Sequence, residues 1–179
     1  TGLEVASELA ESGRAVRLIC SGPLAPALSQ RAQRSTRRTL CGLGVEIHEH
    51  TSVVDVRRRS VSVVGSDGTP VEFPSVTTII TAGFDVPDLA VRSGLTTDAD
   101  GRLLTDETLT SVDDARIVAA GDASSPSGHP LRMSCQAAQP LGAQAANTVL
   151  SRIAGATPTP LNQAFVGQNV SLGRRRATI

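Results

Sequence analysis

The feature that most constrains the fold is a short amphipathic segment that ends at a glycine and leads into an apolar run. In residues 3–12 (LEVASELAES) the apolar side chains recur at helical spacing, and Gly13 follows them at a position where helices end. Residues 15–20 (AVRLIC) then have the length and apolar content of a buried strand. A helix, a glycine and a buried strand form the second half of a βαβ unit. We therefore predict an α/β fold in which the first strand of this unit is missing.

The segments that follow alternate between helix and strand before β-branched residues become frequent. Residues 26–43 predict a second helix with arginines on its exposed side, and residues 66–69 (SDGT) predict a hairpin turn. Residues 87–110 are rich in loop-forming residues. We expect further strands at 45–47, 51–56, 60–64, 71–73, 76–81, 116–120 and 165–172, and a long alanine-rich helix over 134–154.

Charge and composition exclude several classes of protein. The 179 residues carry 17 basic and 17 acidic side chains, and three Phe are the only residues of the Phe, Trp and Tyr types. Neutral charge and few rings argue against a nucleic-acid-binding module. The hydrophobic fraction of 40% supports an aliphatic core rather than a disordered chain. No apolar run approaches the roughly 20 residues of a membrane-spanning helix.

The cysteines and the first residues indicate a cytoplasmic protein. The three cysteines are odd in number and widely spaced, so neither a disulfide framework nor a zinc site is expected. The chain opens without an initiator Met and without a signal peptide. Glu46, His48 and His50 alternate along a strand, which is more typical of solvated side chains than of metal ligands, so we predict no metal site. The arginines at 57–59 and 174–176 are expected to be exposed turn charges with at most weak contact to anionic lipid.

Two positions near the N-terminus are candidates for contact with a nucleotide. Gly2 begins the first helix, where a glycine lets the helix N-terminus approach a strand and a bound pyrophosphate, or is merely a small residue. Ser21 follows the strand at 15–20, where dinucleotide-binding units often carry an acidic residue for the ribose hydroxyls. Because no acid is present there, this position does not distinguish NAD from NADP.

Two further candidates lie in the second half of the chain. Residues 117–122 (IVAAGD) predict a buried strand that delivers Asp122, beside Gly121, either to a sugar or ribitol hydroxyl or to a simple turn. Ser134 precedes the alanine-rich helix, whose exposed amides and positive dipole end could face an electron-rich carbonyl, with Gln136 adding a hydrogen bond. The alternative is an ordinary core helix with Ser134 as its N-cap.

Taken together, these segments resemble the FAD-dependent pyridine nucleotide oxidoreductases, and among them the type II NADH dehydrogenase-like branch. Residues 1–4 (TGLE) are similar to the end of the family's nicotinamide-site glycine motif, and residues 118–122 (VAAGD) to its second FAD motif. Residues 80–83 (ITAG) resemble the strand that returns to the FAD domain. Residues 132–142 and 165–174 resemble the flavin-ring helix and the strand after it.

The resemblance implies a domain organisation. It implies a Rossmann-like NAD(P)-binding domain over residues 1–82, the second part of an FAD-binding domain over 83–164, and the start of a C-terminal or interface region over 165–179. The chain is then an internal fragment of a longer protein and is inactive alone. The missing C-terminal region would give contact with the inner face of the membrane, and a homodimer is compatible with this organisation.

The resemblance also implies cofactors and residue roles. FAD and NAD(P)H would be the cofactors, with Asp122 on the ribitol or phosphate side of FAD and amides near Gln136 and Ala137 facing the flavin pyrimidine ring. Glu4 would be the catalytic residue, positioning the hydride donor near the flavin. The implied cofactor-binding residues are Gly2, Ser21, Ala82, Gly83, Gly121, Asp122, Ser134, Gln136 and Ala137.

The implied function is the transfer of hydride from NAD(P)H to FAD and then to a small-molecule acceptor such as a quinone. Two alternatives stay open. One is a nucleotide-binding module without redox turnover. The other is a disulfide reductase whose cysteine pair lies outside this fragment.

Overall fold

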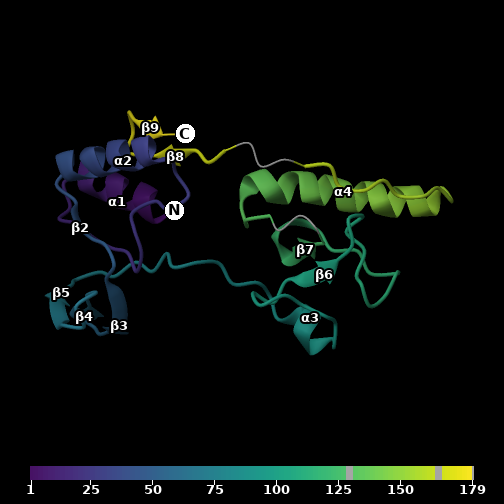
Figure 1. The fold of residues 1–179 in the computed structure, drawn as a ribbon, viewed down its shortest axis with the longest axis horizontal. Helices are drawn as coiled ribbons and strands as arrows, with labels where there is room; N and C mark the ends of the chain where they lie inside the picture. Colours follow the sequence, from purple (N-terminus) through teal and green to yellow (C-terminus); the bar gives the residue numbers. More distant parts are fainter. Residues whose placement is uncertain (128–130, 164–166, 179) are drawn as a thin grey trace. The chain divides into compact units, whose positions relative to one another are not determined.

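The computed structural model describes residues 1–127, 131–163 and 167–178, and the chain forms two units (Figure 1). The first unit comprises residues 1–82 together with 167–179, and the second comprises residues 83–166. The C-terminal residues therefore complete the unit that the N-terminal residues begin.

Two parallel strands, two helices and a small hairpin form the α/β part of the first unit. These elements are α1 (Gly2–Glu11), β1 (Arg17–Ile19), α2 (Gln30–Gly42), β2 (Glu46–His48), β8 (Val170–Ser171) and β9 (Ala177–Thr178). β1 pairs with β2 in parallel, with Leu18 opposite Ile47. Helix α2 begins four residues later than the sequence pattern predicts, because Ser29 acts as its N-cap and accepts a hydrogen bond from the N–H of Ala32 at 3.3 Å.

A three-stranded antiparallel sheet belongs to the same unit. Its strands are β3 (Ser52–Val56), β4 (Ser60–Val64) and β5 (Pro70–Pro74), with β4 in the centre. The predicted turn joins β4 to β5, and Asp67 accepts a hydrogen bond there from the N–H of Thr69 at 3.0 Å. Val61 and Val63 are buried, so the central strand supplies the buried side chains of this sheet. The three strands predicted at 51–56, 60–64 and 71–73 are confirmed.

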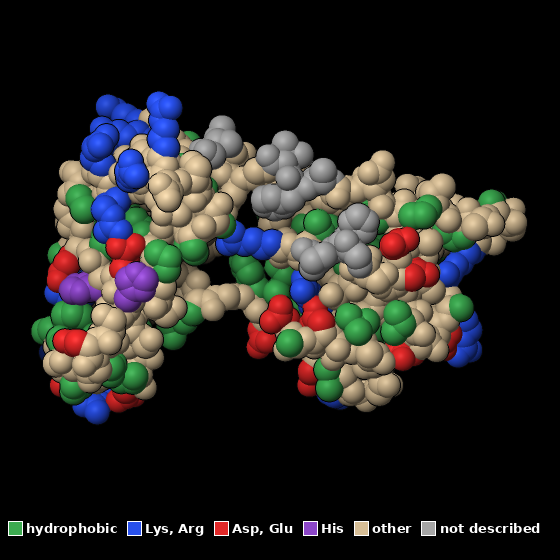
Figure 2. Space-filling view, in the orientation of Figure 1, with side chains coloured by type: hydrophobic (Ala, Val, Ile, Leu, Met, Phe, Trp, Pro, Cys, Tyr) green, Lys and Arg blue, Asp and Glu red, His purple; other side chains and the backbone are tan. Residues whose placement is uncertain are grey.

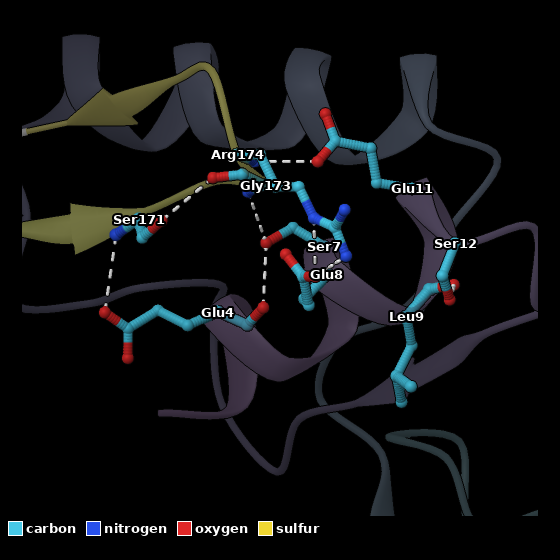
Figure 3. A network of polar contacts seen from close by, with 9 residues as sticks. All are labelled: Glu4, Ser7, Glu8, Leu9, Glu11, Ser12, Ser171, Gly173 and Arg174. Atoms are coloured by element: carbon cyan, nitrogen blue, oxygen red, sulfur yellow. Dashed lines mark hydrogen bonds and ion pairs between the residues drawn. The ribbon is translucent and has the colours of Figure 1, made fainter.

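The β8–β9 hairpin is bound to α1 by a network of polar contacts (Figure 3). The fully buried hydroxyl of Ser7 donates to the carbonyl of Glu4 at 2.9 Å and accepts from the N–H of Gly173 at 2.8 Å. Arg174 forms an ion pair with Glu8 at 2.7 Å, and its own N–H donates to Glu11 at 2.7 Å. A serine on α1 thus satisfies a backbone group that lies 166 positions away in the sequence.

The second unit packs a long helix against irregular loops and one pair of parallel strands. Its elements are α3 (Leu89–Arg92), β6 (Leu103–Thr105), the 3-10 turn η1 (Gly121–Ala123), β7 (Ser124–Pro126) and α4 (Cys135–Ile153). β6 pairs with β7 in parallel, and neither strand was predicted. The core consists of Leu109, Ala137, Leu141, Ala145 and Leu161.

Two predicted strands are wrong. Residues 76–81 form no strand and are exposed; the exposed fraction of Val76 is 98%. None of the described strands pairs with them. β-branched side chains favour a strand, but they cannot replace the hydrogen bonds of a neighbouring strand. Residues 116–120 begin as a turn in which Asp114 accepts from the N–H of Arg116 at 2.9 Å, and only Val118 forms a β-bridge. Of the strand predicted at 165–172, only β8 forms, and residues 165 and 166 lie outside the described residues.

Candidate functional site at the start of helix α4

Helix α4 begins at a side-chain cap that follows from its sequence. Ser134 has extended backbone geometry, and its hydroxyl oxygen accepts a hydrogen bond from the N–H of Ala137 at 3.2 Å. The first-turn amides of a helix carry a partial positive charge and have no partners within the helix. The start of α4 is therefore a place where hydrogen-bond donors gather.

Gly121 and Asp122 lie beside this helix start. One carboxylate oxygen of Asp122 accepts a hydrogen bond from the N–H of Ser134 at 3.1 Å. Gly121 has a φ of +62°, a conformation that residues with a side chain rarely adopt, and an added Cβ would lie 3.8 Å from Ala138. The structure thus brings together four residues that the sequence singled out in separate segments: Gly121, Asp122, Ser134 and Ala137.

The backbone amides at the helix start differ in whether they already have a hydrogen-bond acceptor. The N–H of Ala137 already donates to Ser134, and the Ala137 side chain is buried in the core, so this residue does not have the open amide that we expected. The N–H groups of Cys135 and Gln136 donate to none of the described residues, and both residues are exposed. Cys135 and Gln136 therefore carry the open donors.

Gln163, which no sequence pattern pointed to, holds this helix start. Pro140 lies inside α4 and has no N–H, so the carbonyl of Gln136, four residues earlier, lacks its helical donor. The side-chain amide of Gln163 donates to that carbonyl instead, at 3.0 Å. The amide oxygen of Gln163, Oε1, is buried and has no hydrogen-bond partner among the described residues. A proline inside a helix is a sequence signal that such a compensating donor exists, although it does not identify Gln163.

A partly buried ion pair supports the segment that leads into α4. Arg102 pairs with Asp98 at 2.7 Å and also donates to the carbonyl of Leu131 at 2.9 Å. Burial by itself raises the pKa of Asp98. Hydrogen bonds from the Arg102 backbone and from Ser125, together with the charge of Arg102, lower it by more. The pKa of Asp98 therefore lies below its usual range. The charged Asp98 therefore holds Arg102, which in turn binds the segment before α4.

The first unit contains the residues expected near a nicotinamide nucleotide. At Gly2 an added Cβ would lie 2.7 Å from the hydroxyl oxygen of Thr81, so the start of α1 and residue 81 are in close approach. Glu4 accepts a hydrogen bond from the N–H of Ser171 at 3.3 Å. Ser21 is exposed just beyond the end of β1.

Two predicted residues lie at the boundary between the units. Ala82 is the last residue of the segment that opens the first unit, and Gly83 is the first residue of the second. Both are exposed and follow the irregular segment 76–81. The strand that was expected to lead to them does not form.

Glu49 is a second residue that sequence analysis missed. It follows β2 directly, and its carboxylate accepts a hydrogen bond from the N–H of Leu24 and pairs with Arg37 on α2. The hydrogen bond from Arg37, followed by the one from Leu24, lowers the pKa of Glu49 below its usual range. An acidic residue just after a parallel strand was the available signal, and here it shapes the loop after β1.

The cysteines and histidines of the described residues are further candidate chemical groups. All three cysteines are free, and burial raises the pKa of the Cys20 thiol. In the described parts of the chain, no group of three His, Cys, Asp or Glu side chains is arranged to hold a metal ion. Within the same residues, no helix is both long enough and apolar enough to cross a bilayer. His48 instead pairs with Glu46 at 2.7 Å and packs against Phe73.

Comparison with known proteins decides the family. A family described as pyridine nucleotide-disulphide oxidoreductase matches residues 1–142. The chain belongs to this family. No curated protein matches it.

Several solved structures share the fold of this pyridine nucleotide-disulphide oxidoreductase chain at low sequence identity. An FAD-dependent pyridine nucleotide-disulphide oxidoreductase from Desulfovibrio vulgaris is 20% identical, with a TM-score of 0.73 over 95% of this chain and 44% of its own. The sulfide:quinone oxidoreductase of Aquifex aeolicus is 14% identical, with a TM-score of 0.68 over 86% and 40%. NDH2 from Plasmodium falciparum, solved with NADH, is 18% identical, with a TM-score of 0.61 over 69% and 30%. The chain spans less than half the length of each of these proteins.

The residues at the start of α4 fit the flavin nucleotide that this family binds. A nucleotide with sugar hydroxyls needs an acceptor, which the Asp122 carboxylate provides beside a glycine with no side chain to obstruct a ligand. The electron-rich carbonyls of a flavin ring need donors, which the open amides of Cys135 and Gln136 provide. Both requirements are met within one short stretch of the second unit.

Proposed function

We propose that this chain is part of a flavoprotein that transfers hydride from NAD(P)H to FAD and then to an acceptor such as a quinone, as in the type II NADH dehydrogenase-like branch. The observation that carries the proposal is the hydrogen bond between Asp122 and the N–H of Ser134. This contact places an acidic side chain directly beside the open amides of a helix N-terminus. The family membership supports the general class of reaction.

The residues of the second unit act on FAD by binding and by charge. When bound, FAD supplies the two-electron redox chemistry that amino-acid side chains lack. Asp122 accepts hydrogen bonds from sugar or ribitol hydroxyls. The amides of Cys135 and Gln136, at the positive end of α4, stabilise negative charge on a ring carbonyl and so favour the reduced state of the cofactor.

The residues of the first unit bind the hydride donor in this proposal. Gly2 lets the start of α1 approach Thr81 closely, and the amides of this helix N-terminus would bind a phosphate group. Ser21 lies where the ribose would be held. Glu4 orients the nicotinamide end, since its carboxylate can accept a hydrogen bond from an amide. The absence of an acid at the end of β1 leaves both NADH and NADPH as donors.

The test is the visible spectrum of the full-length protein that contains this chain. We expect a flavin absorbance band that bleaches when NADH or NADPH is added without oxygen, and the faster donor identifies the nucleotide. Glu4→Gln should slow this bleaching while FAD stays bound. A protein that binds nucleotide without a flavin band would be a binding module, and the proposal would be wrong.

A pair of matched variants tests the role of Asp122. Asp122→Asn keeps an oxygen for the N–H of Ser134 but removes the charge, so FAD affinity should fall by about tenfold. Asp114→Asn is the control, because it removes one half-buried carboxylate whose side chain pairs, among the described residues, with its neighbour Arg116 alone. Equal FAD affinity in the two variants, measured by flavin fluorescence during dilution, would remove Asp122 from the site.

A further inference from the structure

Helix α2 has a continuous exposed face of arginines. Ala32, Thr36 and Leu40 recur every four residues and are buried. Arg31 and Arg34 are exposed, and so is Arg38, seven residues after the first of them. At 100° per residue these three side chains share one stripe on the side opposite the buried residues, and the stripe is about 10 Å long. No acidic residue occurs in α2.

The turn between β8 and β9 extends this basic surface. β9 lies against α2, and Val170 and Leu172 share a core with Ala32 and Leu40, so the hairpin and the helix form one body. The turn contributes the exposed Arg175 and Arg176. Figure 2 shows the blue arginine side chains gathered over α2 and this turn. We call the five residues the arginine face: Arg31, Arg34, Arg38, Arg175 and Arg176.

The arginine face has no internal charge partner. Arg37 pairs with Glu49 and Arg174 pairs with Glu8. The side chains of the arginine face, by contrast, form no hydrogen bond or ion pair with any residue in the described ranges. Five cations held together without counter-charges repel one another. A complementary anionic surface would relieve that repulsion.

A cleft lies beside the arginine face. It has a volume of about 490 Å³ and is lined by Glu11, Ser12, Leu43, Arg174, Arg175 and Arg176. Two residues of the arginine face, Arg175 and Arg176, therefore border a hollow that is large enough for a side chain from another molecule. The carboxylates of Glu8 and Glu11 lie next to the same turn, where they bind Arg174.

The charge and side-chain types of this surface favour a protein over a lipid bilayer or a nucleic acid as its binding partner. A lipid bilayer would need apolar anchors, and none of the large exposed apolar residues among the described ones lies in residues 29–43 or 167–178. A nucleic acid would need a uniformly basic surface and stacking rings, whereas Glu8 and Glu11 border this one and it contains no aromatic residue. A protein surface that alternates carboxylates with neutral groups matches both the cations and their acidic border.

We propose that the arginine face is a docking surface for an acidic partner protein. Every basic residue of the chain is arginine, and the planar guanidinium group can bind a carboxylate through two parallel hydrogen bonds. Several such pairs together give orientation and a fast, salt-dependent association. The proposal does not depend on the redox function and can be tested without a cofactor.

The experiment measures binding of a fluorescein-labelled, glutamate-rich peptide to the whole chain by fluorescence anisotropy. Arg34→Gln combined with Arg38→Gln should weaken binding by about tenfold, since two ion pairs with the peptide are lost. The matched control is Arg58→Gln combined with Arg59→Gln, which removes two exposed arginines from the turn between β3 and β4. The control should change the affinity by less than about twofold. Circular dichroism checks that both variants are folded.

Three outcomes would overturn the proposal. The first is equal weakening in the two double variants, because binding would then follow total charge rather than position. The second is no binding of the peptide by the unaltered chain at low salt. The third is tighter binding, through the same arginines, of duplex DNA or of phosphatidylserine vesicles than of the peptide.

Discussion

Pro140 and Gln163 have linked roles in α4, because one removes a backbone donor and the other replaces it. The proline leaves the carbonyl of Gln136 without a helical donor, and the side chain of Gln163 supplies one at 3.0 Å. Without Gln163, the first turns of α4 would contain an unsatisfied carbonyl. A residue outside the helix therefore influences how well the candidate site is held.

A double-mutant cycle tests this pair. Gln163→Leu should lower the free energy of unfolding by about 1–2 kcal/mol, because the carbonyl of Gln136 loses the donor that replaces its helical one. In a Pro140→Ala background the helix regains its own N–H, so the same change should cost less than about 0.5 kcal/mol. Urea unfolding of the four variants measures both values. An identical cost of Gln163→Leu in the two backgrounds would contradict the pairing.

At the scale of elements, the β8–β9 hairpin depends on α1 through a buried serine (Figure 3). Ser7→Ala would leave the N–H of Gly173 without its acceptor at 2.8 Å, so we expect a loss of about 1–3 kcal/mol. Faster hydrogen exchange at Gly173 should accompany the loss. Ser12→Ala is the control, since the exposed hydroxyl of Ser12 bonds, within the described part of the chain, to the carbonyl of Leu9 alone. Unchanged exchange at Gly173 in the Ser7 variant would show that the hairpin is held by other contacts.

The segment leading into α4 should respond to pH through Asp98. The folded pKa of Asp98 lies below its usual range, so its charge stabilises the folded state above the ordinary aspartate pKa of about 3.9. This contribution is lost as the pH falls through the folded pKa. Stability measured between neutral pH and about pH 3 should therefore fall more steeply in the unaltered chain than in Asp98→Asn. Asp100→Asn, at an exposed carboxylate 3.7 Å from Arg102, should retain the steep fall.

At the scale of the whole molecule, residues 76–81 (VTTIIT) expose apolar, β-branched side chains, and none of the described strands pairs with them. Ile80 is 74% exposed, and an exposed segment of this kind is a site of self-association. Ile80→Lys should reduce light scattering by concentrated solutions without lowering the unfolding temperature. Val112→Lys, at a residue 56% exposed in the second unit, is the control and should leave the scattering unchanged. Equal scattering by the unaltered chain and the Ile80 variant would exclude this segment as the cause.

Much of the fold could be predicted because it depends on local periodicity. The spacing of apolar residues predicted α1, α2 and α4, and the β-branched runs predicted β3, β4 and β5. Strand prediction failed where pairing decides the outcome: the equally β-branched residues 76–81 have no described partner strand, whereas the less distinctive β6 and β7 pair with each other. A strand is stable only when a neighbour satisfies its backbone groups, and that neighbour is not visible in local sequence.

The sequence by itself determined the family, the residue types of the candidate site and the positions of its helix start, because glycine, aspartate and serine act there through local backbone geometry. Only the tertiary structure decided which groups meet across long separations. The contacts of Gln163 with Gln136 and of Gly173 with Ser7 join residues 27 and 166 positions apart. Such contacts arise because an unpaired buried polar group costs free energy, and the partner is whichever group the packing of the chain brings within reach.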